Sequence, residues 1–232
     1  MKLRIKFRKY GALKFIGHLD VMRYFQKAIR RSGIDIAYSN GFSPHQIMSF
    51  AAPLGVGLTS DGEYFDIEVH SVTTAEDMKK RLNDTMAEGM EILEVRLLPD
   101  NCKNAMASVA AAGYIITFRE GHEPKVNMAD AVSWFESQTN VPYVKQTQKS
   151  EIELDLKQSV FEIRLLAENE LYLLVDASSA GNIKPTMLME TFYKNYGVEP
   201  DAFEWCVHRT ETYLRDTQNN CFTRLGSAGT EF

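Results

Sequence analysis

The sequence predicts an α+β protein made of two tandem ferredoxin-like domains, each with the order strand, helix, strand, strand, helix, strand and an antiparallel sheet. Three observations predict this class: alternation of charged and apolar residues at the start, a helical period of apolar residues after it, and a similar order of elements beyond residue 108. The expected domains are residues 1–100 and 108–214. We expect the remaining tail, 215–232, to be disordered.

In the first domain, basic residues at even positions alternate with apolar residues at odd positions along residues 2–8, as in a half-buried strand. Residues 18–32 place apolar and basic side chains on opposite halves of a helical wheel, and Gly33 suits the end of that helix. Thr73 or Thr74 is the expected cap of a second helix. The expected strands are 2–10, 46–52, 63–69 and 91–98, and the expected helices are 18–32 and 74–87.

The split βαβ order makes the first and third strands neighbours. The cations of the first strand then lie beside Asp66 and Glu68 on the face that the helices leave uncovered; they are Lys2, Arg4, Lys6 and Arg8. Opposite charges paired across strands stabilise a sheet by roughly 0.2–1 kcal/mol each. The basic stripe of the first strand is therefore either paired within the sheet or part of a nucleic-acid surface.

The second half follows a similar order. Residues 100–108 resemble a linker, and Pro185 suits the first turn of a helix, where a missing N–H leaves no bond unmade. The expected strands are 109–118, 151–156, 160–166, 171–175 and 203–214, and the expected helices are 128–138 and 185–196.

Composition narrows the possible functions. No apolar run approaches the roughly 20 residues that cross a bilayer, and the N-terminus lacks the apolar core of a signal peptide. We therefore expect a cytoplasmic protein with no membrane partner. Cys102, Cys206 and Cys221 form no Cys-x-x-Cys pair, which argues against zinc ribbons, redox pairs and iron–sulfur clusters. We expect no metal and no cofactor of its own.

Charge is distributed unevenly along the chain. The net charge is −5, yet residues 1–40 hold ten Lys and Arg against two Asp, a sum of +8. Such asymmetry indicates a basic face on an acidic body. We expect nucleic-acid or anion binding by basic and polar residues of the first helix and the following loops: Arg23, Lys27, Arg30, Arg31, Ser43, His45 and Ser60.

The stretch from residue 40 to residue 68 is dense in glycine, proline and small polar residues, a composition typical of ordered loops that carry a site. Tight turns between strands are the simpler explanation. The residues expected to form this loop site are His18, Asp20, Asn40, Phe42, Gly57 and Glu63.

His18 and His45 both lie next to breaks in regular structure. If the turn before the first helix approaches the loop after Asn40, the two imidazoles can act as acid and base in RNA cleavage. The alternatives are a metal site with Asp20 or Glu63, and local hydrogen bonds that only satisfy backbone groups.

Three segments stand out together: FIGHLDVMRYFQKAIRRSGI at 15–34, GFSPHQIMSFAAPLGVG at 41–57 and SDGEYFDIEV at 60–69. They resemble a bacterial family described as a radical-SAM-linked domain of unknown function, over about residues 1–70. In that family a small protein stands beside, or is fused to, a radical S-adenosylmethionine enzyme. The resemblance implies a radical SAM partner and an RNA or ribosome-related setting. Radical chemistry would belong to the partner, because this chain lacks the cluster-binding cysteines.

The sequence is consistent with three functions. The first is a non-catalytic accessory module that binds RNA, such as tRNA or rRNA, and presents it to a separate radical SAM enzyme. The second is a metal-independent RNA endonuclease that uses His18 and His45. The third is a protein scaffold without nucleic acid.

Overall fold

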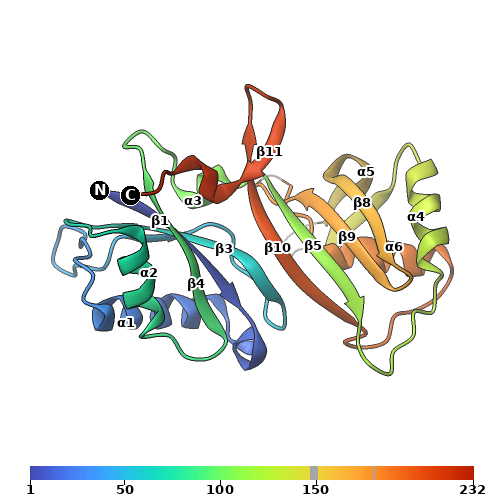
Figure 1. Cartoon of the computed structure of the whole chain (residues 1–232). Helices are drawn as coiled ribbons and strands as arrows, with labels where there is room; N and C mark the ends of the chain where they lie inside the picture. The colour runs from blue at the N-terminus through green and yellow to red at the C-terminus, as the bar shows by residue number, and fades with distance from the viewer. Residues whose placement is uncertain (147–150, 180) are drawn as a thin grey trace. The chain divides into compact units, whose positions relative to one another are not determined.

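The computed structural model describes residues 1–146, 151–179 and 181–232. These residues form six α-helices and mostly antiparallel β-sheet, a mixed α+β structure (Figure 1). They divide into two compact units: unit 1 consists of Met1–Ala110 and Arg209–Phe232, and unit 2 of Ala111–His208. Unit 1 therefore contains residues from both ends of the chain, whereas the expected first domain ended at residue 100.

Unit 1 follows the predicted order of elements through its first 98 residues. Its strands lie in the order β4-β1-β3, β2 pairs with β3, and the part of β10 from Arg209 onward also lies beside β3. The elements are β1 (Lys2–Lys9), η1 (Gly11–Phe15), α1 (His18–Ser32), β2 (Met48–Phe50), β3 (Thr59–Glu68), α2 (Ala75–Asn83), β4 (Met90–Leu98), α3 (Ala105–Ser108), β10 (Trp205–Asp216), β11 (Cys221–Arg224) and η2 (Leu225–Ala228).

The core of unit 1 lies between the sheet and the helices α1 and α2. The alternation of β1 turns Leu3, Ile5 and Phe7 toward this core, and all three are almost completely buried. Phe25 of α1 packs edge-on against Phe7, with ring centroids 4.7 Å apart. The two sequence periods, 2 in the strand and 3.6 in the helix, therefore meet in one apolar layer, as predicted.

The opposite face of the sheet is charged, and the predicted pairing of its charges is confirmed. The strand register places Lys2 opposite Glu68 and Arg4 opposite Asp66. The other two cations of this face are paired with carboxylates other than the expected Asp66 and Glu68: Lys6 with Glu211 at 2.6 Å and Arg8 with Asp61 at 2.9 Å.

The Arg4–Asp66 pair is buried and joins distant segments of unit 1. The guanidinium makes two parallel bonds to the carboxylate, of 2.8 and 2.9 Å. Arg4 also donates to the carbonyls of Leu225 and Lys103, at 3.1 Å each. Asp66 accepts the backbone N–H of Ala105 at 2.6 Å. The expected linker and the end of the chain are thereby fixed against the sheet.

The expected disordered tail, 215–232, is part of the fold of unit 1. Within it β11 pairs with β10, and Leu225 is completely buried. Leu97 and Thr230 exchange two backbone hydrogen bonds of 2.9 Å. The small polar residues of this segment carry no periodic pattern. Backbone bonds hold it, together with the buried Leu225 and with Phe232, which packs against the core.

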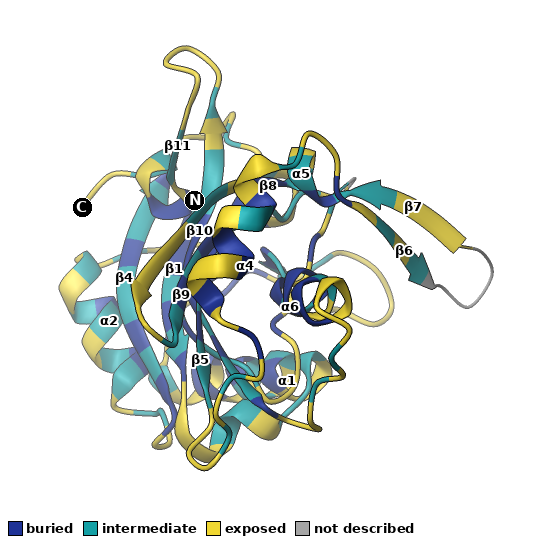
Figure 2. Ribbon diagram, turned by 90° about the vertical axis from the view of Figure 1, so that its right-hand side faces the viewer, coloured by how far each residue is buried: buried dark blue, intermediate teal, exposed yellow. Residues whose placement is uncertain are grey.

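Unit 2 has a sheet in the order β5-β9-β8 and a separate hairpin, β6–β7, that is largely exposed (Figure 2). Phe135 and Phe192, from two different helices, meet in its core with ring centroids 6.2 Å apart. Its elements are β5 (Ala111–Phe118), α4 (Met128–Ser137), β6 (Pro142–Gln146), β7 (Glu151–Asp155), α5 (Leu156–Ser159), β8 (Val160–Ala167), β9 (Glu170–Asp176) and α6 (Pro185–Asn195).

Replacing Arg4 by Met is expected to lower the free energy of unfolding by about 3–5 kcal/mol, because Asp66 keeps its buried charge and loses its counterion. Urea unfolding followed by circular dichroism measures this. Lys2→Met is the control, since Lys2 and Glu68 are partly exposed and 4.0 Å apart; its effect should stay within about 1 kcal/mol. Equal losses in the two variants would contradict a special role for Arg4.

Candidate functional site

The polar face of α1 is exposed, and its cations differ in their partners. Arg23 lies 3.8 Å from Asp20, both well exposed, and Arg31 donates to the carbonyl of Thr85 at 3.0 Å. Lys27 and Arg30 are exposed and make no ion pair or hydrogen bond with any residue that the structure describes. These two cations are therefore the ones available to an external anion.

The loop from Tyr38 to Gln46 folds back beside α1. Its two sides are joined where the N–H of Ser39 donates to the carbonyl of His45 at 2.8 Å, and where Tyr38 and Gln46 form a β-bridge. Gln46 is anchored to the helix, since its amide nitrogen donates to the carbonyl of Gln26 at 3.2 Å. Asn40, Phe42 and Ser43 lie exposed at the tip of this loop.

A groove of about 210 Å³ lies between this loop and the helix, and we call it the α1 groove. Ser39 accepts the N–H of His45 at 3.1 Å, and its hydroxyl lies 2.8 Å from His45 Nδ1. If the hydroxyl donates to Nδ1, the neutral ring carries its proton on Nε2. The residues lining the groove are Gln26, Arg30, Tyr38, Pro44, His45 and Gln46.

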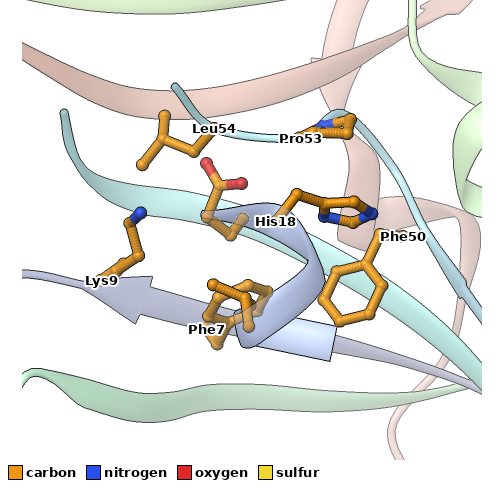
Figure 3. A pocket seen from close by; sticks show the side chains of 8 residues that line it. Phe7, Lys9, His18, Phe50, Pro53 and Leu54 are labelled. Carbon is orange, nitrogen blue, oxygen red and sulfur yellow. The ribbon is translucent and has the colours of Figure 1, made fainter. Parts of the chain in front are cut away.

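A second feature, which we call the Lys9 cavity, lies at the start of α1 (Figure 3). Its volume is about 10 Å³, which is at the lower limit for holding one water molecule. His18 stands edge-on to Phe50 with ring centroids 5.2 Å apart. The residues lining the cavity are Phe7, Lys9, His18, Val21, Phe50, Pro53, Leu54 and Glu63.

Lys9 is the unusual residue of this cavity, because its side chain is charged in water and only 2% exposed here. Its ammonium donates to the carbonyls of Ile16 at 3.2 Å and Lys14 at 3.5 Å. Burial lowers the pKa of Lys9; the charge of Glu63 opposes this shift and that of Arg209 adds to it. The amine is thus easier to deprotonate than an exposed lysine.

Glu63 is held by a residue far along the chain. Arg209 donates to its carboxylate at 2.8 Å, and the same guanidinium nitrogen donates to the carbonyl of Ala52 at 2.9 Å. Both side chains are more than nine-tenths buried. This pair fixes the loop after β2 and places the carboxylate of Glu63 beside Lys9. The amine and the carboxylate together could bind one proton or one small polar group.

The structure places the predicted site residues in separate groups. His18 and Glu63 line the Lys9 cavity, while His45 lines the α1 groove. Gln26 of that groove lies eight residues beyond His18 on α1, about 12 Å along the helix axis at about 1.5 Å per residue. Nothing in this placement pairs His18 with His45 as acid and base.

Two further predicted residues, Ser60 and Gly57, make hydrogen bonds that stabilise the local fold. Ser60 is completely buried, and its hydroxyl accepts the N–H of Gly62 at 3.0 Å. Gly57 has a φ of 87° and donates its N–H to the carbonyl of Lys14 at 2.8 Å, joining its loop to η1. A side chain at Gly57 would be strained at this φ, which explains the glycine.

Sequence reasoning missed Lys9, Arg209 and Gln46. For Lys9 a signal existed: the odd positions of β1 face the core, and residue 9 continues that series after Leu3, Ile5 and Phe7. Arg209 gave no such signal, because its partner Glu63 lies 146 residues away.

These features define a mixed α+β protein with one exposed basic groove and one small buried charged cavity in unit 1. The chain belongs to a bacterial family described as "Uncharacterized protein conserved in bacteria (DUF2344)", whose model matches residues 2–185. None of the curated proteins matches the chain.

A solved structure described as "Crystal Structure of a Cbf5-Nop10-Gar1 Complex" contains a similar chain, with 9% sequence identity and a TM-score of 0.49. The match covers 90% of this protein and 48% of that chain, so this protein spans about half of its length. A similarity at this level carries no argument about function. Among the described residues, no helix is long and apolar enough to span a membrane, and no three His, Cys, Asp or Glu side chains are grouped to hold a metal.

Lys9→Met tests the buried amine through the pH dependence of stability. The pKa of Lys9 is lower in the folded protein than the ordinary value of 10.5. The unfolded chain therefore binds more protons between the two pKa values, and wild-type stability rises with pH in that window. We expect the free energy of unfolding of wild type, relative to Lys9→Met, to increase as the pH rises through this window toward 10.5.

Urea unfolding of both proteins across this range measures the difference, and subtracting the variant removes the titration of the tyrosines. Lys80→Met is the control, because Lys80 is exposed on α2 and its hydrogen bond to Asp84 raises its pKa instead of lowering it. The corresponding difference for Lys80 should therefore not increase with pH. A constant difference between wild type and Lys9→Met would show that the amine titrates in the same way in both states.

Proposed function

We propose that this protein is an RNA-binding accessory module that presents RNA to a separate radical SAM enzyme. The observation that carries the proposal is the exposed face of α1, where Lys27 and Arg30 have no partner among the described residues. Arg30 lines a groove together with Tyr38, whose loop also bears the exposed Phe42. Free cations next to exposed aromatic rings are typical of surfaces that bind single-stranded nucleic acid.

The charge distribution supports this location. Residues 1–40 sum to +8, but the four even-numbered cations of β1 are paired with carboxylates and Lys9 is buried. The positive potential left for an external anion therefore centres on α1. Phosphates would contact Lys27 and Arg30, and unstacked bases would contact the aromatic side chains of the loop.

A separate surface of unit 1 suits the protein partner. Phe15, Leu19 and Val56 are each between 60% and 64% exposed, and exposed apolar side chains that gather on one surface mark interaction sites. Their segments are joined by the bond from Gly57 N–H to the carbonyl of Lys14. We assign docking of the radical SAM enzyme to these three residues, named here the apolar patch. The segments that suggest such a partner, residues 15–34 and 41–57, contain all three.

We also interpret each unit as a ferredoxin-like fold. The elements β1, α1, β2, β3, α2 and β4 follow that order in unit 1. In the other unit β5, α4, β8, β9 and α6 fill the first five places of the same order, with the β6–β7 hairpin and α5 inserted after α4. The sixth place would fall to β10, of which only residues 205–208 belong to this unit. In a ferredoxin-like fold the helices cover one face of the sheet. The cations of α1 lie on the side of the helix that faces solvent.

The double variant Lys27→Ala/Arg30→Ala is expected to weaken RNA binding and reduce its salt dependence. Each phosphate contact to single-stranded RNA contributes about −0.7 to the slope of log K against log salt, so the slope should become less steep by about 1.4. Fluorescence anisotropy of a labelled single-stranded RNA at several salt concentrations measures this. The control is Lys80→Ala/Lys194→Ala, which removes two exposed cations from other helices. An unchanged slope in the α1 variant would contradict the proposed phosphate contacts.

Leu19→Asp/Val56→Asp is expected to weaken association with a co-expressed radical SAM enzyme by about ten-fold or more, because charges replace apolar contacts at the interface. RNA affinity should be unchanged. Met106→Asp is the control, since Met106 is exposed to a similar degree on α3. Co-purification and calorimetric titration measure the association. Wild-type affinity in the double variant would exclude the apolar patch as the docking surface.

A further inference from the structure

We propose that the α1 groove receives one nucleotide, whose base stacks on Tyr38 and donates a hydrogen of its exocyclic amino group to Gln46 Oε1. This inference rests on the RNA-binding function proposed above and adds the chemical group that the groove recognises. Three independent features of the groove lead to it: an unmet buried acceptor, an exposed aromatic ring and a cation without a partner.

The unmet acceptor is the amide oxygen of Gln46. Its side chain is 6% exposed and lines the groove. Its amide nitrogen donates to the carbonyl of Gln26 at 3.2 Å. A carbonyl can only accept, so this bond fixes which end of the amide is nitrogen and which is oxygen. Within the described part of the chain, Oε1 is buried and accepts no hydrogen bond. Buried acceptors rarely lack a donor, and an N–H group of a ligand would supply the missing one.

The aromatic ring is that of Tyr38, which is 46% exposed although it belongs to the same β-bridge as Gln46. The bridge keeps the two side chains at neighbouring positions, next to the same groove. A base that stacks on Tyr38 can therefore bring its edge next to the side chain of Gln46, and the bond to Oε1 would form when the base displaces the atoms that cover this oxygen. Stacking alone accepts every base, since each has a π-face, whereas the acceptor requires a base that can donate.

The cation is Arg30. It lines the groove, is exposed and has no partner among the described residues. Its planar guanidinium suits a phosphate oxygen. His45 adds a second donor if Ser39 holds its ring as the Nε2–H form. The residues lining the groove include no carboxylate, so an anion meets no like charge there.

The size of the groove favours one nucleotide over a larger ligand. Its volume of about 210 Å³ is below the roughly 300–1,000 Å³ of clefts that enclose drug-sized molecules. One base with part of its ribose is a fragment of suitable size. Adenine, cytosine and guanine carry an exocyclic amino group, and uracil does not.

Three matched pairs of single-stranded RNA oligonucleotides test the proposal. Each pair differs only in the exocyclic amino group: adenine against purine, cytosine against pyrimidin-2-one, and guanine against hypoxanthine. Wild-type protein is expected to bind the amino-bearing member of at least one pair about ten-fold more tightly, because the analogue leaves Gln46 Oε1 without a donor. In Gln46→Met, which has no amide, the two members of that pair should bind within about two-fold of each other.

The outcomes separate this proposal from the function on which it rests. Salt-dependent binding by wild type without discrimination in any pair would overturn the nucleotide site and leave RNA binding standing. A wild type that binds no oligonucleotide would overturn both. Discrimination that persists in Gln46→Met would assign recognition to another residue and overturn the role of Gln46.

Tyr38 supplies a second test that does not depend on a buried side chain. Tyr38→Leu is expected to weaken binding of all oligonucleotides by about ten-fold through loss of stacking, while Tyr38→Phe keeps the ring and should bind nearly as wild type. Circular dichroism confirms that each variant is folded. Wild-type affinity in Tyr38→Leu would overturn the stacking contact.

Discussion

The buried ion pair between Arg4 and Asp66 is the constraint on which unit 1 depends. Neither residue could be buried alone, because an unpaired charge in the interior is strongly unfavourable. Together they join β1 to β3. Arg4 also donates to the carbonyls of Lys103 and Leu225, and Asp66 accepts the N–H of Ala105. The segment after β4 and the end of the chain therefore meet on the sheet face opposite the helices. A single ion pair thus holds two chain segments over the sheet face that the helices leave uncovered.

Pairing on that face also decides where charge remains available. The even-numbered cations of β1 point at carboxylates, so the most basic part of the sequence is largely neutralised by its own fold. On α1 the partners are fewer, and Lys27 and Arg30 have none among the described residues. A count of charges along the sequence therefore overestimates the basic surface, whereas the structure leaves most of the unpaired cations of residues 1–40 on α1. The RNA-binding proposal depends on that distribution.

The sequence was most informative where a period repeats. Alternation in β1 was sufficient to place Arg4 beside Asp66, and the helical period was sufficient to bury Phe25 of α1. It was least informative where a contact joins distant segments: Arg209 reaches Glu63, and Leu225 reaches Arg4, without any local pattern. The candidate site followed the same division. Arg30 and His45 were recognisable as polar residues near turns. Only the folded structure shows that Gln46 is buried against α1, in the same groove, with an acceptor left unmet.

The Lys9 cavity and the α1 groove suit different roles, because the buried polar groups of the cavity have hydrogen-bond partners and one buried polar group of the groove has none. In the Lys9 cavity every charged group faces another polar group: Lys9 donates to two carbonyls and Glu63 accepts from Arg209. Little space and little unmet hydrogen bonding remain there, so the cavity is well suited to fixing the start of α1. The α1 groove has more space, an unmet acceptor and a free cation. An unmet polar group in a protein is unfavourable until a ligand satisfies it, so binding is expected at the groove and structural support at the cavity.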